Sequence, residues 1–426
     1  MGFIRKAPGG TFRACWRDPA GGQKSKSFPT KREASAFLAD IESTMNRGTY
    51  VAPNAGKLRF RVYVERWSAS RGFTARATER TASILRNHLL PKWGEWPLGS
   101  IDHLSVQEWV TQLGKTLAPA TVGKCFGALR AILRSAVRGR LITVDPTDGV
   151  AAPSTYQPRP RNATISRQSF FATLLPAVPL DHRAIVATAA GTGMRWGEAA
   201  GLPWNAVDLS RRELNVGQVA IETAAEVTIR AYPKSRAGVR TIPLPDFLVR
   251  ELEAHRELTV GDREPDPGWL VFPTRNGTPQ RRSNFRRQVW RPTLVRAGVL
   301  GSIETLSDAW RATWSDSSGT TGCQTFPTER EAVAHVAQHA VGGLRFHDLR
   351  HSYATWLVSD GVPVNIVQTV MGHEQASTTL NRYTHTPDGH GQRVRAAFDS
   401  SPAAFSLPPE DQSDDQEGEQ TTDDRR

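Results

Sequence analysis

The stretch FHDLRHSYATWL, residues 346–357, places two side chains suited to chemistry on one turn of a helix. His347 stands three residues before Arg350, and this spacing brings both to the same helix face. A second stretch, VMGHEQASTTLNRYTH (370–385), carries a Gly-His pair followed ten residues later by Tyr383. Fixed cations, imidazoles and a phenol can neutralise an anion and supply an oxygen nucleophile.

A third stretch lies farther upstream and reads ATAAGTGMRWGEAAGLPWNAVDL (187–209). It holds Arg195 and, three residues later, Glu198. Its segment GTGMRWG (191–197) begins like a dinucleotide-binding fingerprint. The third glycine is misplaced and no convincing strand precedes the segment, so nucleotide binding is disfavoured.

Lysine usage singles out one position. The chain has nine lysines against 45 arginines, and after Lys124 only Lys234 remains, in the turn YPKSRAG (232–238). Lysine can release a proton at accessible pH, whereas arginine cannot. Lys234 could therefore serve in proton transfer, or it could be an ordinary surface residue of a hairpin that has no function; the pattern is compatible with both.

Together these pieces resemble the tyrosine recombinase family, which includes the phage integrases. They occur in the family's order: 187–209, Lys234, 346–357 and 370–385. The resemblance covers the whole of residues 164–395. It implies an enzyme that cleaves and rejoins DNA site-specifically without a cofactor, to integrate or excise a mobile element or prophage.

The resemblance also implies catalytic roles. Tyr383 is expected to attack the phosphodiester and form a 3′-phosphotyrosine, while Lys234 protonates the leaving 5′ oxygen. Arg195 and Arg350 are expected to neutralise charge on the nonbridging oxygens, since each guanidinium offers a bidentate fork.

Two histidines and one carboxylate complete the expected site. His347 is expected to assist proton movement at the nucleophile, and His373 to donate a hydrogen bond to the phosphate. Glu198 would orient Arg195. Flanking residues are interpreted as packing that positions the site: Gly193, Leu202, Trp204, Leu349, Tyr353, Ala354 and Leu357.

The sequence predicts a multidomain, mainly α fold with small β-sheets. Pro- and Gly-rich stretches mark linkers, and the acidic end lacks apolar residues. The expected parts are a ββ(β)α module (1–50), a linker (51–58), a helical domain (59–152), a second linker (153–163), a mixed α+β domain (164–405) and a disordered acidic tail (406–426). By resemblance these domains are an arm-type DNA-binding module, a core-binding domain and a catalytic domain.

Local patterns support these parts. Thr30 and Glu33 form a capping-box pattern that predicts a helix start, after β-like runs at 11–16 and 24–28. Phe60, with apolar residues at helical spacing after it, predicts a buried helix face. Three short strands are expected in the last domain, at 214–221, 227–232 and 240–244.

The charge of the chain points to a polyanionic partner. The formal net charge is +12, although residues 410–424 carry eight acids. Basic side chains at helical spacing can follow phosphates, although they can equally form a solvated face. The candidate DNA contacts are Lys24, Lys26, Lys31, Arg76, Arg80, Arg130, Arg134 and Arg138.

The chain contains an internal repeat. Residues 13–34 align without gaps on 311–332, with eleven identical positions. The same small module is therefore expected twice, the second time inserted at about 302–341. At the positions of Lys24, Lys26 and Lys31 the second copy has Gly322, Gln324 and Glu329. We expect this copy to make protein contacts or act as a spacer, because its lost lysines disfavour phosphate binding.

Other classes of protein are disfavoured. Three cysteines, Cys15, Cys125 and Cys323, offer neither a disulfide framework nor a zinc site. No apolar run approaches the length of a membrane span. We expect a cytoplasmic, nucleoid-associated protein in a bacterial cell or phage-infected host. Its expected partners are double-stranded DNA with attachment sites, three further copies in a tetramer on DNA, and possible accessory directionality or architectural proteins.

Two alternatives remain open. One is a DNA-binding regulator that has this fold but performs no chemistry. The other is a metalloenzyme, because two pairs of histidines are spaced i, i+4, as zinc ligands often are. Those pairs are His335 with His339 and His347 with His351, and neither has a glutamate of the HExxH type.

Overall fold

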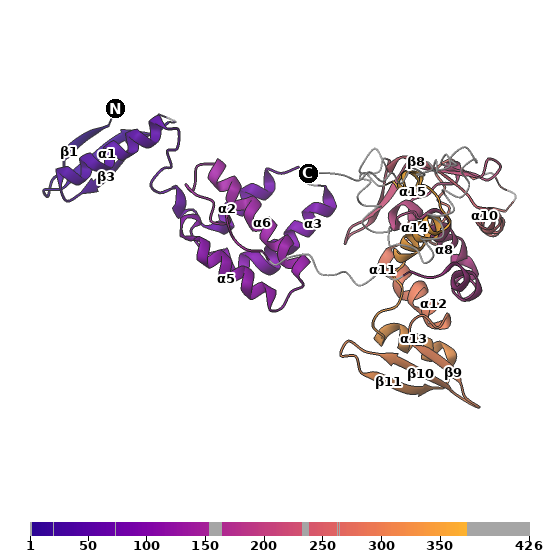
Figure 1. The fold of residues 1–426 in the computed structure, drawn as a ribbon. Coiled ribbons are helices and arrows are strands. Elements are labelled where there is room, and N and C mark those ends of the chain that lie inside the picture. The colour runs from indigo at the N-terminus through magenta and orange to yellow at the C-terminus, as the bar shows by residue number, and fades with distance from the viewer. Residues whose placement is uncertain are drawn as a thin grey trace, which may run out of the picture. The chain divides into compact units, whose positions relative to one another are not determined.

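A computed structural model of the protein describes residues 2–19, 21–72, 74–152, 164–231, 238–261, 263 and 265–372. The described chain is mainly helical with small antiparallel sheets, as predicted (Figure 1). It forms two compact units. The first holds the described residues up to 152 together with 218–231 and 270–286, and the second holds the remaining described residues.

The N-terminal module is a three-stranded sheet packed on one helix. Its elements are β1 (Phe3–Lys6), β2 (Phe12–Arg17), β3 (Gln23–Phe28) and α1 (Lys31–Asn46). The Thr30 hydroxyl accepts from the Glu33 amide, and the Glu33 carboxylate accepts from the Thr30 amide, which confirms the capping box. Trp16 lies in the core of the module, and its Nε1 donates to the Tyr50 hydroxyl at 2.9 Å.

The helical domain has a hydrophobic core of its own. Its helices are α2 (Phe60–Ala69), α3 (Ala75–Ile84), a π-helical turn (Leu85–Leu89), α4 (Leu90–Trp93), α5 (His103–Gly114) and α6 (Pro119–Arg138), with short 3-10 turns at Ala55–Lys57 and Leu98–Ser100. Phe60, Val64 and Trp67 are all buried in its core, so the predicted helix face is confirmed.

The second unit is built around α8 (Leu180–Thr192), which is buried from Ala184 to Thr192. A helix that is apolar on all sides needs cover on all sides, and α8 packs on α10 (Asp246–Thr259) and α14 (Asp348–Ser359). Its other elements include α7 (Arg167–Ser169), a π turn (Phe170–Leu174), α9 (Trp196–Ala200), β4 (Val207–Asp208), β5 (Glu213–Val216), β8 (Arg240–Pro243), α12 (Arg291–Arg296) and α15 (Val364–Met371).

The single strand expected at 214–221 is wrong. The structure has two strands there: β5 pairs with β4 and β8, whereas β6 (Val219–Glu222) pairs with β7 (Val227–Arg230). β5 alternates buried and exposed residues, with Leu214 and Val216 in the core. Every residue of β6 is half-buried, so it has no such alternation. The chain therefore changes sheet at residues 217–218.

The inserted module, residues 302–341, repeats the fold of the N-terminal module. It consists of β9 (Ser302–Thr305), β10 (Trp310–Ser315), β11 (Thr321–Phe326) and α13 (Glu329–His339). Trp310 pairs with Phe326 in the second copy as Phe12 pairs with Phe28 in the first, so the registers agree. The repeat extends upstream of the alignment, since β9 pairs with β10 as β1 pairs with β2.

The inserted module is fastened to α12 through its helix. The guanidinium of Arg291 donates to the carbonyls of Ala337 and Ala340 at the end of α13. Arg296 forms an ion pair with Glu329 at 3.1 Å. In Figure 1 the sheet of the module projects beyond α13, on the side away from α12. The module is therefore held by one face and presents the other face of its sheet to its surroundings.

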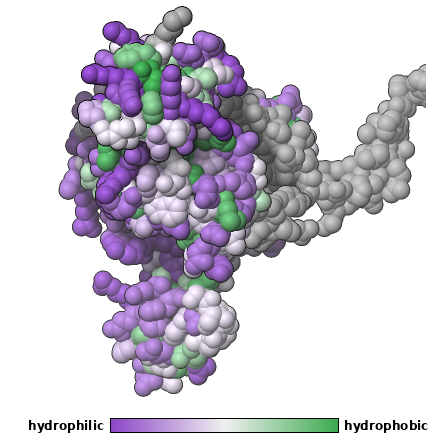
Figure 2. All heavy atoms as spheres, turned by 90° about the vertical axis from the view of Figure 1, so that its left-hand side faces the viewer, coloured by the Kyte–Doolittle hydropathy of each residue, from purple (hydrophilic) through white to green (hydrophobic). Residues whose placement is uncertain are grey.

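The described surface is largely hydrophilic on the face drawn in Figure 2, where hydrophobic residues form small separate patches. None of the described helices is long and apolar enough to cross a membrane.

Candidate active site

Arg195 is placed by a tight turn between two helices. α8 ends at Gly193, whose φ of 62° lies in the left-handed region that favours glycine. A Cβ at this position would lie 2.5 Å from the ring of Tyr353 and 2.9 Å from the sulfur of Met371. The chain therefore passes close to α14 and α15 before Arg195, the N-cap residue of α9.

Glu198 holds Arg195 in place. The Arg195 amide donates to Glu198 Oε2 at 2.9 Å, and its Nη1 donates to Oε1 at 2.8 Å. Glu198 is only 3% exposed, whereas the Arg195 side chain is 42% exposed. Burial raises the pKa of Glu198, but the attraction and hydrogen bonds of Arg240, together with Arg195, outweigh it and hold the pKa below its usual value. The carboxylate is therefore ionised, and it accepts hydrogen bonds from both the backbone amide and the side chain of Arg195.

Arg350 reaches the same place from α14. It is 3% exposed, and its Nη1 and Nη2 donate to the carbonyls of Gly193 at 2.5 Å and Met371 at 2.6 Å. Arg195 Nη2 donates to the carbonyl of the next residue, Gly372, at 3.0 Å. The two arginines thus meet at the C-terminal end of α15, although they are far apart in sequence.

His347 is the N-cap residue that directly precedes α14, and its ring lies beside that of His351, with centroids 5.1 Å apart. Desolvation of the ring, then the neighbouring His351 and Arg350, lower the pKa of His347 to about 4. The imidazole is therefore neutral near pH 7, and a neutral imidazole can accept a proton.

Three expected site residues, Lys234, His373 and Tyr383, lie outside the described residues. The structure does describe Gly372, which immediately precedes His373. Among the described tyrosines, Tyr353 is buried near the site, and burial raises its pKa to about 12. That direction opposes activation of its hydroxyl, so Tyr353 is suited to packing.

The structure adds Arg240, which lies outside the set of residues predicted for the site. Its side chain is 4% exposed, and its Nη2 donates to Glu198 Oε2 at 3.0 Å. A signal was present in the sequence: Arg240 lies in phase with Ile242 and Leu244 in the predicted strand, and these two are buried. An arginine on the inward side of a strand must be paired.

The residues expected to provide packing are buried or partly buried. Leu202, Trp204, Leu349, Tyr353 and Ala354 are all buried, and Leu357 is partly buried in the same cluster as Tyr353. In the described ranges, no group of three or more His, Cys, Asp or Glu side chains could hold a metal ion.

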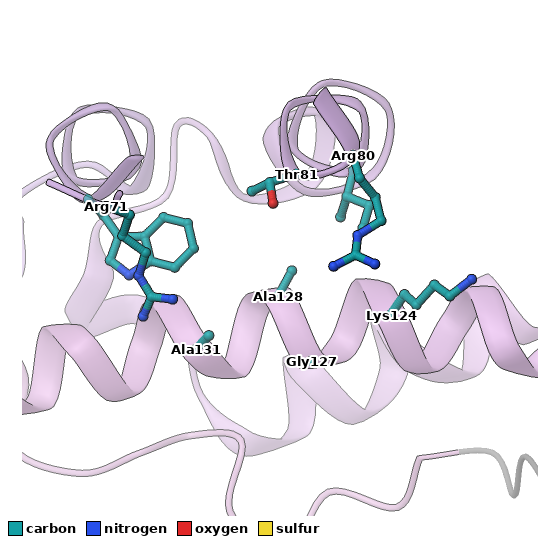
Figure 3. Close-up of a pocket in the computed structure, with 9 residues that line it drawn as sticks. Arg71, Arg80, Thr81, Lys124, Gly127, Ala128 and Ala131 are labelled. Atoms are coloured by element: carbon teal, nitrogen blue, oxygen red, sulfur yellow. The ribbon is translucent and has the colours of Figure 1, made fainter. Parts of the chain in front are cut away.

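The helical domain carries a hollow lined by cations. Its volume is about 260 Å³, and Arg71, Arg80 and Lys124 stand around it. Figure 3 shows Arg71 and Arg80 above α6, with Ala128 and Ala131 on the helix between them. Arg71 stacks on the Trp67 ring, 4.5 Å from its centroid.

The other expected DNA contacts differ in their surroundings. Arg134 donates to Asp145 at 2.9 Å and Arg130 lies 3.6 Å from Asp148, so acids after α6 offset part of the predicted basic ridge. Lys24 lies 3.6 Å from Asp18, and the Lys26 ammonium lies 4.9 Å from the Phe37 ring centroid. The remaining three, Lys31, Arg76 and Arg138, are exposed.

The chain is similar to known integrases. Residues 324–390 match the family model described as the Phage integrase family. Over 410 residues the chain is 26% identical to a protein named as a prophage phiRv2 integrase from Mycobacterium tuberculosis, covering 93% of this chain and 94% of that protein. It is 23% identical over 384 residues to an integrase from Streptomyces ambofaciens, covering 86% of each chain.

Among solved structures, the chain resembles the Tn1549 transposon integrase in complex with a circular intermediate DNA. The TM-score is 0.55 at 18% identity, over 79% of this chain and 98% of that chain. This likeness concerns the fold.

Proposed function

The chain belongs to the tyrosine recombinases, the family of the phage integrases, and we propose that it integrates or excises a mobile element by cleaving and rejoining DNA through a 3′-phosphotyrosine. The observation that carries the proposal is the convergence of Arg195 and Arg350 on the carbonyls of Gly372 and Met371. That turn leads directly into the segment that holds His373 and Tyr383.

The arginines can stabilise the charge that develops on a phosphate. Arg195 uses two of its five guanidinium N–H groups on Glu198 and Gly372 among the described residues. The remaining donors and the exposed side chain leave Arg195 able to bind a nonbridging oxygen. Positioned donors of this kind are often the largest contribution to catalysis.

The proposed cleavage step is a displacement at phosphorus. The Tyr383 oxygen forms a bond to phosphorus, and the bond from phosphorus to the 5′ oxygen breaks. The phenolic proton passes to a base, the role proposed for His347, and Lys234 supplies a proton to the 5′ oxygen. The phosphotyrosine keeps the energy of the broken bond, so rejoining to another 5′ hydroxyl needs no ATP.

We further propose that the helical domain and the N-terminal module hold DNA, and that four chains act together on two duplexes. The cations around the hollow in Figure 3 suit phosphates, because clustered Lys and Arg release counterions from DNA when they bind. We also propose that accessory proteins bind in this assembly and determine the direction of recombination.

Removal of two cationic side chains from the hollow should lower the affinity for DNA and make that affinity less dependent on salt concentration. For Arg80→Ala combined with Lys124→Ala, we expect the slope of log K against log salt to fall in magnitude by about 0.9 for each lost phosphate contact. A salt titration of binding measures this slope. Arg134→Ala is the matched control: its charge is already offset by Asp145 at 2.9 Å, so it should change the slope less. An unchanged slope in the double variant would contradict the proposal.

The inserted module is proposed to contact protein during joining of two sites. Replacing residues 302–341 by a short Gly-Ser linker should leave adduct formation on a single site nearly intact but impair joining. Because α13 packs on α12, a second variant spares the helix: Thr313→Arg with Thr325→Arg changes only the opposite face of the sheet. Gel assays of single-site adduct and two-site product compare the steps. Full joining by both variants would show that the module is dispensable.

A further inference from the structure

Arg240 is a buried cation to which the proposed reaction assigns no role. Its side chain is 4% exposed, and the strand positions that share its face, Ile242 and Leu244, are in the core. Its Nη1 donates to the Gly238 carbonyl at 3.0 Å and approaches Glu198 Oε1 at 3.4 Å. A charge buried in this way persists only when its donors are satisfied.

Three arginines bind three consecutive carbonyls at the end of α15. Arg240 Nε donates to the Val370 carbonyl at 2.6 Å; Arg350 and Arg195 take the next two, those of Met371 and Gly372. The last carbonyls of a helix lack partners within the helix and carry the negative end of its dipole. Three guanidinium groups from separate parts of the chain therefore fix this helix end.

The three arginines are not equivalent. Arg195 is 42% exposed, and Arg240 is 4% exposed. Glu198 joins these two, with Oε1 2.8 Å from Arg195 Nη1 and Oε2 3.0 Å from Arg240 Nη2. Arg240 is therefore the buried arginine that contacts only protein atoms among the described residues, and Arg195 is the exposed arginine that can contact DNA.

We propose that Arg240 is a positioning residue for the recombination reaction, which fixes Glu198, and through it Arg195, while holding the Val370 carbonyl. The inference rests on the proposed function. In this arrangement the buried guanidinium of Arg240 fixes the position of Arg195 with respect to the turn that precedes His373 and Tyr383. Since its donors face protein atoms inside the fold, Arg240 acts through Glu198 and the helix end rather than on the phosphate.

A double-mutant cycle on the rate of cleavage tests this role. Arg240→Met and Glu198→Gln should each reduce adduct formation at saturating DNA by about 100-fold, because displacing a catalytic group by about 1 Å costs that much. DNA affinity should stay near that of the parent chain. If Arg240 acts through Glu198, the double variant should lose little more than the worse single variant. Independent effects would instead multiply to about 10⁴-fold and would overturn the proposal.

Further variants separate positioning from folding. Arg240→Lys keeps the charge, but a single ammonium is a compact point charge without the guanidinium fork. It should fold and bind DNA, yet cleave more slowly than the parent chain; cleavage at the parent rate would overturn the proposal even if Arg240→Met fails to fold. Arg212→Met is the matched control, since it removes an exposed ion pair with Asp246 and should leave cleavage unchanged. If the parent chain itself forms no adduct, the proposed function fails, and not this inference alone.

Discussion

Tyr383→Phe is expected to bind DNA as tightly as the parent chain and to form no covalent adduct. The substitution removes only the phenolic oxygen, so folding and phosphate contacts should persist while the nucleophile is lost. The measurement is a trapping assay: DNA carrying candidate sites is incubated with protein, and protein attached to the 3′ side of the break is resolved on a denaturing gel. Strand transfer at the parent rate by this variant would refute the assignment of Tyr383.

Controls for this experiment come from the same chain. Tyr63→Phe removes a hydroxyl that donates to Ser135 in the helical domain at 2.9 Å, far in sequence from the site, and should leave the adduct unchanged. Repeating the assay in excess EDTA tests the metalloenzyme alternative, because a required metal would be removed. A parent chain that binds its sites tightly and never forms an adduct would favour the DNA-binding regulator.

Lys234→Ala is expected to slow cleavage of ordinary DNA by ~10²–10⁴-fold, the range typical of a lost general acid. A substrate with sulfur in place of the bridging 5′ oxygen should restore the rate, because a thiolate leaves without needing a proton. Rates of adduct formation on the two substrates measure this rescue.

Arg195→Ala provides the contrast for the sulfur substrate. Its expected task is to neutralise charge on nonbridging oxygens, and that charge is present in both substrates. Sulfur should therefore rescue Lys234→Ala and not Arg195→Ala. Equal responses of the two variants would show that Lys234 is not the acid.

Local sequence patterns determined much of the architecture. The capping box at Thr30 fixes a helix start because its hydrogen bonds join residues three apart. Phe60, Val64 and Trp67 determine a buried helix face because helical periodicity is itself local. The internal repeat was also readable, since 13–34 and 311–332 share both sequence and strand register.

Two other sequence patterns did not predict the structure fully, namely the β-like run at 214–221 and the basic stripe that includes Arg134. The run at 214–221 is β-like throughout, but it divides because β5 finds a partner in β8 and β6 finds one in β7. Likewise, Arg134 continues a basic stripe in the sequence, and only the folded loop brings Asp145 to within 2.9 Å of it. In each case the partner lies outside the periodic pattern, so the pattern alone does not identify it.

The same distinction applies to the candidate site. The sequence by itself supplied the residue types and their order, including Arg195, Glu198, His347 and Arg350. Only the tertiary structure placed Arg240 against Glu198 and aligned three arginines on the end of α15. Periodicity reports on neighbours a few residues apart, whereas a buried charge is stabilised by whichever opposite charge and carbonyls the fold brings to it, and those partners lie 42 and 130 residues away in the chain.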